Sequence, residues 1–298
     1  MRLVVLGGGE SGVGTAILGK QKGYDVFVSD FGKIKDSYKE VLTNNEIIWE
    51  DEKHTEALIL NADVVMKSPG IPDKAPIVKK LVEKKIPVIS EIEFAYPYTD
   101  AVTIGITGSN GKTTTTMLTY HLLKEGGLNV GLGGNIGKSF AWQVAEENYD
   151  CYVLELSSFQ LDGIVHYKPH IAIITNISPD HLDRYDYNYD KYIASKFRIT
   201  MNQNEGDYLI YDSDDVAMNN WLNNNTIKAK PIPFSITKSS KEGAYLNDKT
   251  MEININQEEF MMETAQISLE GKHNLKNAMA ATSVAQLMRI RKQTIRES

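Results

Sequence analysis

The stretch Ile104-Gly-Ile-Thr-Gly-Ser-Asn-Gly-Lys-Thr-Thr-Thr115 decides how this chain folds, because closely spaced glycines join an apolar run to a helical pattern. Such a loop points backbone N–H groups at a helix N-terminus, where the helix dipole favours anions. Lys112 would supply a cation for the terminal phosphates, and Thr113 would place a hydroxyl at a Mg²⁺ ion. The general phosphate loop has a glycine five positions before Gly111, where this chain has Ile106. The loop still predicts a site for the phosphates of ATP.

Apolar runs on either side of this loop alternate with amphipathic stretches. Val- and Ile-rich runs that are continuous rather than alternating predict parallel strands covered on both faces. Strands are expected at residues 3–6, 25–29, 64–67, 87–90, 102–106, 151–156, 171–176, 208–211 and 251–255. Helices are expected at residues 75–85, 112–124, 189–201 and 275–288. This order predicts an α/β fold with parallel sheets.

The pattern pauses near residues 96–100 and restarts at Val102, which predicts a domain boundary. One domain is expected at residues 1–95 and the second at 96–298, in line with the usual length of domains. The Asn-rich residues 202–257 are expected to form strands and turns, and residues 290–298 a charged tail or linker.

Composition excludes several classes of protein. The formal charge of −7 argues against a nucleic-acid binder, which normally presents a basic face. A single cysteine, Cys151, rules out an intramolecular disulfide framework and is expected as a small core residue. The first apolar run is too short for a signal peptide, and no window approaches the roughly 20 apolar residues of a membrane span. We expect a cytoplasmic protein without membrane insertion, acting as a monomer.

A second glycine loop, residues 7–12, follows the first expected strand and contains a formal G-x-G-x-x-G. Asp30 ends the second strand, where a ribose-binding carboxylate would lie. A nicotinamide, a flavin or another pyrophosphate ligand could occupy such a loop. Because a phosphate loop follows in the same chain, we favour a nucleotide-diphosphate substrate.

Polar residues gather at the carboxyl ends of the expected strands, where open α/β sheets bind ligands. Glu155 closes one strand and is suited to hold Mg²⁺ directly or through water. The next strand leads to Asp180-His-Leu-Asp-Arg184, which favours a site at the same edge. Lys196 follows on a helix, and its pattern alone predicts a solvent-facing side chain.

Taken together, the chain resembles the Mur ligases. The motifs that carry the resemblance are Gly108-Ser-Asn-Gly-Lys-Thr-Thr114, Gly134-Asn-Ile-Gly137, Leu154-Glu-Leu-Ser-Ser-Phe-Gln160, Asp180-His-Leu-Asp-Arg184 and Gly271-Lys-His-Asn-Leu-Lys-Asn277. Within that family the chain most resembles the members that add D-glutamate to UDP-N-acetylmuramoyl-L-alanine. The resemblance implies a Rossmann-like UDP-binding domain followed by a P-loop ATPase-type central domain.

What the resemblance implies is an amide ligase of cell-wall peptidoglycan synthesis that uses ATP and Mg²⁺. The substrate carboxylate would attack the γ-phosphate to give an acyl phosphate, and the D-glutamate amine would then displace phosphate. Phosphorylation turns a carboxylate oxygen into a good leaving group, so the enzyme mainly positions reactants and stabilises charge.

The family's site residues carry over by motif. Lys112, His181 and Lys196 would be catalytic. ATP would contact Gly108, Ser109, Asn110, Gly111, Lys112, Thr113, Thr114, Asn274 and Asn277. The substrate would contact Gly9, Glu10, Ser11, Gly12, Asp30, Phe31, Ser68, Pro69, Gly70, Asn135 and His181. Two Mg²⁺ sites would use Thr113, Glu155, His181 and Lys196, the last as a carbamylated lysine.

One departure from the family is large. Its members have a third, C-terminal domain that binds the incoming amino acid, and this chain has no match to it. Rival hypotheses are another Mur-type ligase or a folylpolyglutamate synthase, an NAD-linked dehydrogenase, and a nucleotide-binding switch that is not an enzyme. Ligand-specific protection from thermal unfolding separates them.

Overall fold

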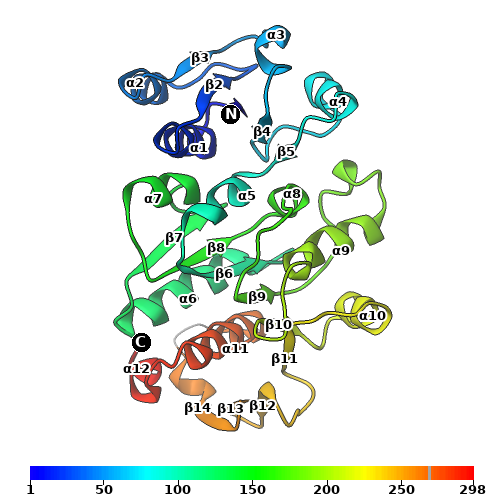
Figure 1. The fold of residues 1–298 in the computed structure, drawn as a ribbon. Coiled ribbons are helices and arrows are strands. Elements are labelled where there is room, and N and C mark those ends of the chain that lie inside the picture. Colours follow the sequence, from blue (N-terminus) through cyan, green and yellow to red (C-terminus); the bar gives the residue numbers. More distant parts are fainter. Residues whose placement is uncertain (268–269) are drawn as a thin grey trace. The chain divides into compact units, whose positions relative to one another are not determined.

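The structure is a computed structural model that describes residues 1–267 and 270–298. The chain divides into two compact units (Figure 1). One comprises residues 1–100, 133–148 and 159–167, and the other comprises residues 101–132, 149–158 and 168–298. Each unit has a hydrophobic core of its own, the first around Val4, Leu6 and Val65 and the second around Ile104, Ile106 and Ile173.

The first sheet is parallel throughout, with the strand order β3-β2-β1-β4-β5. Its strands are β1 (Arg2–Leu6), β2 (Asp25–Ser29), β3 (Ile48–Glu50), β4 (Val64–Lys67) and β5 (Val88–Ile89). The strand order reverses between β1 and β4, and open α/β sheets bind ligands at such a point. The two loops that follow β1 and β4 therefore lie where a ligand is expected.

The second sheet has the order β14-β13-β12-β11-β10-β9-β6-β8-β7. Strands β8, β6, β9, β10 and β11 run parallel, whereas β12 to β14 form an antiparallel meander. Its strands are β6 (Val102–Thr107), β7 (Val130–Gly134), β8 (Cys151–Glu155), β9 (Ile171–Ile174), β10 (Tyr208–Asp212), β11 (Lys230–Ser235), β12 (Gly243–Asn247), β13 (Thr250–Ile255) and β14 (Glu258–Glu263). Their carboxyl ends bring residues far apart in sequence to one edge.

Helices connect these strands and cover the sheets. They are α1 (Glu10–Gln21), α2 (Asp36–Asn44), α3 (Glu56–Ile59), α4 (Pro76–Glu83), α5 (Glu91–Ala95), α6 (Lys112–Glu125), α7 (Phe140–Glu146), α8 (Ser158–Asp162), α9 (Tyr189–Phe197), α10 (Val216–Asn224), α11 (Lys272–Leu287) and α12 (Lys292–Glu297). Short 3-10 helices are η1 (Tyr96–Tyr98), η2 (Leu182–Arg184), η3 (Arg198–Thr200) and η4 (Thr264–Gln266). The α/β class and its parallel sheets are confirmed.

Several elements were not predicted, and β11 shows why. Its sequence contains Pro231 and Pro233, and proline within a run argues against a strand. Lys230 donates its backbone N–H to Asp207 on the β10 side, so the alternating prolines face the β12 side. Strand β12 pairs only with Phe234 and Ser235, beyond both prolines. The prolines therefore cost no hydrogen bond of the sheet, and β11 can form despite them.

Two further predictions concern single residues or short segments. Cys151 is buried in β8, as predicted, and burial raises the pKa of its thiol to about 12. The charged tail expected at residues 290–298 is wrong, since α12 forms there and buries Ile295 in the core of the second unit. Within the described residues no helix has the length and apolar character needed to cross a bilayer.

Candidate functional site

The loop between β6 and α6 owes its glycines to its neighbours. A Cβ on Gly108 would lie 1.9 Å from Thr175 Oγ1, and one on Gly111 would lie 2.6 Å from Asn277 Oδ1. Gly111 also has a φ of 78°, in the left-handed region where side chains are strained. These close approaches explain the Gly108–Gly111 spacing of this loop.

The segment after β9 holds the loop from one side. Thr175 Oγ1 and Asn176 Nδ2 both donate to Asn110 O, at 2.6 and 2.8 Å. Ser178 N donates to Ser109 Oγ at 2.9 Å. The loop conformation is therefore fixed by residues that lie 65 to 69 positions further along the chain.

Lys112 lies over the loop that precedes it. Its Nζ donates to Gly108 O and to Ser109 O, at 3.0 Å each. The N-terminus of the 14-residue helix α6 begins at the same residue. Unsatisfied N–H groups of a first helical turn and an adjacent ammonium form an anion site, which fits the phosphates of a nucleotide.

Thr113 and Glu155 meet at the end of β8. Thr113 Oγ1 donates to Glu155 Oε2 at 2.8 Å, and Glu155 is 1% exposed. A hydroxyl and a carboxylate are hard oxygen donors, which Mg²⁺ prefers. No group of three or more His, Cys, Asp or Glu side chains in residues 1–267 and 270–298 is placed to hold a metal ion by itself. Because Mg²⁺ commonly keeps waters and takes phosphate oxygens, the pair still fits this ion.

Lys196 lies inside the protein, so the solvent-facing position predicted from its pattern is wrong. It is 2% exposed, and its Nζ donates to Gly108 O at 2.8 Å. The ammonium also lies 4.7 Å from the ring centre of Tyr192, whose hydroxyl is 3.0 Å from Ser109 Oγ. Helix α9 thus brings a buried cation to the phosphate loop.

His181 differs from these residues in being exposed. Its side chain is 56% exposed, and its Nε2 lies 3.5 Å from Asp180 Oδ2. The residue has a left-handed backbone with a φ of 48°, and it lies in a tight turn immediately before η2. Asp183 is exposed and Arg184 half-buried in that short helix. The loop is accessible to a ligand.

Helix α11 closes the other side of the phosphate loop. Asn277 Oδ1 accepts a hydrogen bond from Thr115 Oγ1 at 3.2 Å, across 162 positions of sequence. Asn277 Nδ2 lies 3.4 Å from Asn274 Oδ1, so both predicted asparagines belong to one turn. Asn277 therefore lies against Gly111 and Thr115, at the end of the phosphate loop.

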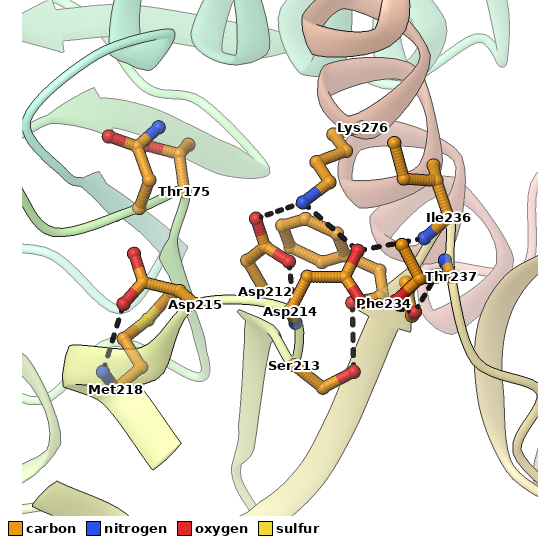
Figure 2. A network of polar contacts seen from close by, with 12 residues as sticks. Thr175, Asp212, Ser213, Asp214, Asp215, Met218, Phe234, Ile236, Thr237 and Lys276 are labelled. Atoms are coloured by element: carbon orange, nitrogen blue, oxygen red, sulfur yellow. Dashed lines mark hydrogen bonds and ion pairs between the residues drawn. The ribbon is translucent and has the colours of Figure 1, made fainter. Parts of the chain in front are cut away.

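Sequence reasoning missed a polar cluster at the ends of β10 and β11. Lys276 of α11 pairs with Asp212 and Asp214 (Figure 2). Nearby, Asp215 Oδ2 accepts a hydrogen bond from Ile177 N at 2.7 Å. The run Asp212-Ser-Asp-Asp215 directly after a predicted strand was the available signal. Lys276 gave no such signal, since its partner Asp212 lies 64 positions away in the sequence.

In the first unit, the loop after β1 meets the loop after β4. A Cβ on Gly7 would lie 2.5 Å from Ser68 Oγ, and one on Gly12 would lie 1.8 Å from Gly7 O. Asp30 accepts hydrogen bonds from Gly8 N at 2.6 Å and Gly32 N at 2.8 Å. The carboxylate expected at a ribose therefore shapes the glycine loop itself.

The other predicted substrate residues have varied surroundings. Phe31 and Gly70 are exposed, and Pro69 and Ser11 are half-buried. Glu10 Oε1 accepts from Ser139 N at 3.0 Å within the same unit.

Asn135 is exposed in the turn after β7, which an isolated bridge between Gly133 and Lys138 closes. The structure thus places Asp30 and Ser68 against the glycine loop, at Gly8 and Gly7 respectively, whereas Asn135 lies in a separate turn.

The sequence matches two protein-family models and several proteins of known name. The model of the Mur ligase middle domain matches residues 106–285, and that of the MurD N-terminal domain matches residues 2–77. UDP-N-acetylmuramoylalanine–D-glutamate ligase of Christiangramia forsetii is 64% identical over 297 residues, covering 100% of this chain and 67% of that protein. The Bacteroides fragilis enzyme of the same name is 53% identical with the same coverage.

Solved structures share the fold at low identity. The UDP-N-acetylmuramate:L-alanyl-γ-D-glutamyl-meso-diaminopimelate ligase of Neisseria meningitides has a TM-score of 0.68 at 19% identity, covering 99% of this chain and 96% of that chain. The UDP-N-acetylmuramate–alanine ligase of Thermotoga maritima has a TM-score of 0.59 at 19% identity, covering 100% and 67%. These matches support the fold of each unit.

Proposed function

This chain belongs to the Mur ligase family, and from that premise we propose that it acts, as a cytoplasmic monomer, in the ATP-dependent joining of D-glutamate to UDP-N-acetylmuramoyl-L-alanine. The names of its relatives support this pair of substrates. The observation that carries the proposal is the meeting of Lys112, Lys196 and the Thr113–Glu155 pair at one phosphate loop.

We assign the two nucleotides to separate domains. UDP would be held by residues 1–95, through Gly9, Glu10, Ser11 and Gly12 with Asp30, Phe31, Ser68, Pro69 and Gly70. ATP would be held by residues 96–298, through residues 108–114 with Asn274 and Asn277. The glycine loop after each first strand supports this division.

The reaction follows from the charges at the loop. A carboxylate oxygen of the substrate attacks the γ-phosphorus, and the bond from that phosphorus to the bridging oxygen breaks as ADP leaves. Lys112 and the N–H groups of α6 stabilise the negative charge on the transferred phosphoryl group. The amine nitrogen then attacks the acyl carbon, loses a proton, and phosphate departs with its oxygen. Asn135 and His181 are assigned to orient the substrate.

Bound Mg²⁺ would neutralise phosphate charge, and two ions are proposed. Thr113 and Glu155 would hold the first, with His181 and Lys196 at the second. We propose that Lys196 is carbamylated. The carbamate on this buried lysine would offer carboxylate-like oxygens to a metal ion beside the loop. The amine adds to CO₂, forming an N–C bond and releasing a proton.

Binding measurements test the division between the two loops. We expect Lys112→Ala to abolish ATP–Mg²⁺ binding and to spare UDP-N-acetylmuramoyl-L-alanine binding, because only one loop loses its cation. A ligand at about a hundred times its Kd adds about 2.7 kcal/mol to the free energy of unfolding, so thermal shifts report each ligand separately.

Lys124→Ala is the control, since it removes an exposed lysine from the far end of the same helix. Equal loss of both ligands in Lys112→Ala would contradict separate sites. Protection by NADH instead of the UDP-sugar would favour a dehydrogenase.

A further inference from the structure

Lys276 forms a buried ion-pair cluster that the proposed chemistry does not use. Its Nζ lies 2.7 Å from Asp212 Oδ2 and 3.0 Å from Asp214 Oδ2 (Figure 2). The side chains of Lys276, Asp212 and Asp214 are 19%, 6% and 12% exposed. At such burial the pair is screened far less than a surface pair. The cluster therefore constrains the elements that carry it.

Asp214 is tied to the end of β11 as well as to Lys276. Ser235 Oγ donates to its Oδ1 at 2.6 Å, and Ile236 N donates to its Oδ2 at 3.0 Å. Thr237 Oγ1 also donates to this carboxylate. Burial would raise the pKa of Asp214, but these hydrogen bonds and Lys276 outweigh it and hold that pKa well below the ordinary value. The anion is thus fixed in place.

Both carboxylates also affect the pKa of Lys276. Burial opposes its charge, but the hydrogen bonds and charges of Asp212 and Asp214 outweigh burial and raise its pKa. Burial raises the pKa of Asp212, and neighbouring Asp214 adds to that effect while Lys276 opposes it. Without the ammonium, two adjacent carboxylates would repel each other across the end of β10.

Lys276 lies in the first turns of α11. The helix begins after Gly271, which has a φ of 96° and provides no side-chain cap. Asn277, next to Lys276, is the residue that lies against Gly111 and accepts from Thr115. A shift of this turn would therefore move the side chains that contact the phosphate loop.

We propose that Lys276 is a positioning residue for ATP, which holds Asn274 and Asn277 of α11 against the phosphate loop through its pair with Asp212 and Asp214. The proposal rests on ATP binding by this loop. Lys276 acts through its neighbours and need not touch the nucleotide itself.

The test compares Lys276→Met with Lys124→Met, which removes one exposed positive charge from the same unit. Isothermal titration with ATP–Mg²⁺ should give a Kd about tenfold higher for Lys276→Met and unchanged for Lys124→Met. The Kd for UDP-N-acetylmuramoyl-L-alanine should be unchanged in both, and Lys276→Arg should recover most of the ATP affinity because it keeps the charge.

A double-mutant cycle tests the ion pair itself, and its Asp212→Asn variant alone still tests the proposal if Lys276→Met fails to fold. Asp212→Asn keeps the shape of the side chain and should raise the ATP Kd about threefold, and combining it with Lys276→Met should add little to the single Lys276 change. Full additivity, or an unchanged ATP Kd in a folded Lys276→Met protein, would overturn the positioning role. A wild-type chain that fails to bind ATP would instead overturn the proposed function.

Discussion

At the scale of single residues, Lys196 is where burial and charge conflict most directly. Lysine is seldom fully buried, and Lys196 is 2% exposed beside the phosphate loop, with its Nζ donating to Gly108 O. If the proposed carbamate forms, ¹³C-labelled bicarbonate should give a carbamate resonance in the presence of ATP and Mg²⁺. Lys196→Ala should lose that resonance entirely, because no other lysine is proposed to react.

Lys191→Ala provides the matched control, since Lys191 is exposed on the same helix and pairs with Asp186. It should keep the resonance. A wild-type protein that shows no carbamate with nucleotide, metal and bicarbonate all present would remove this modification from the site.

At the scale of elements, helix α5 holds the beginning of helix α7 through one carboxyl group. Glu91 Oε1 accepts hydrogen bonds from Ser139 Oγ and from Ala141 N, at 2.5 and 3.0 Å. Burial raises the pKa of Glu91, and hydrogen bonds from Ser139, Ala141 and Ser11 oppose the rise only in part. A raised folded-state pKa stabilises the protein below the ordinary value of 4.5, and that stability is lost as pH rises through the folded value.

Glu91→Gln removes this titration and keeps an oxygen that can accept both hydrogen bonds. Urea unfolding should therefore show the variant gaining stability relative to wild type between pH 5 and pH 8. Glu83→Gln changes an exposed glutamate and should show no such trend. Glu91→Ala should lose about 1–3 kcal/mol at pH 5, because two donors are left without an acceptor, and less at pH 8, because it removes the same titration. A Glu91→Gln difference that does not vary with pH would contradict the role of burial.

At the scale of the whole molecule, each unit has its own sheet and its own core. Ligand binding should therefore protect different backbone amides in each unit. With ATP–Mg²⁺, hydrogen exchange should slow about tenfold or more at residues 108–115, 175–178 and 274–277. With UDP-N-acetylmuramoyl-L-alanine it should slow at residues 7–12, 30–31 and 68–70. Either ligand protecting only the other ligand's set would contradict the assignment.

The sequence by itself determined the class of fold and the position of the phosphate loop. Parallel strands buried on both faces are continuous apolar runs, so β2 and β4 were predicted with the bounds that they have. The loop after β6 could be predicted equally well, because a strand, two glycines, Lys112, Thr113 and a helix follow one another in the chain. Signals of this kind are local, and they depend little on what packs against them.

Only the tertiary structure decided which polar side chains are buried and what they hold. Lys196 looked like a surface lysine because its position beneath Gly108 depends on a contact across 88 positions. Gly111 is needed for a contact with Asn277, and Lys276 finds its carboxylates at the ends of other strands. The prolines of β11 are tolerated because β12 pairs only with the residues that follow them. The environment of a buried polar side chain depends on segments that are distant in sequence, so a local sequence pattern does not predict it.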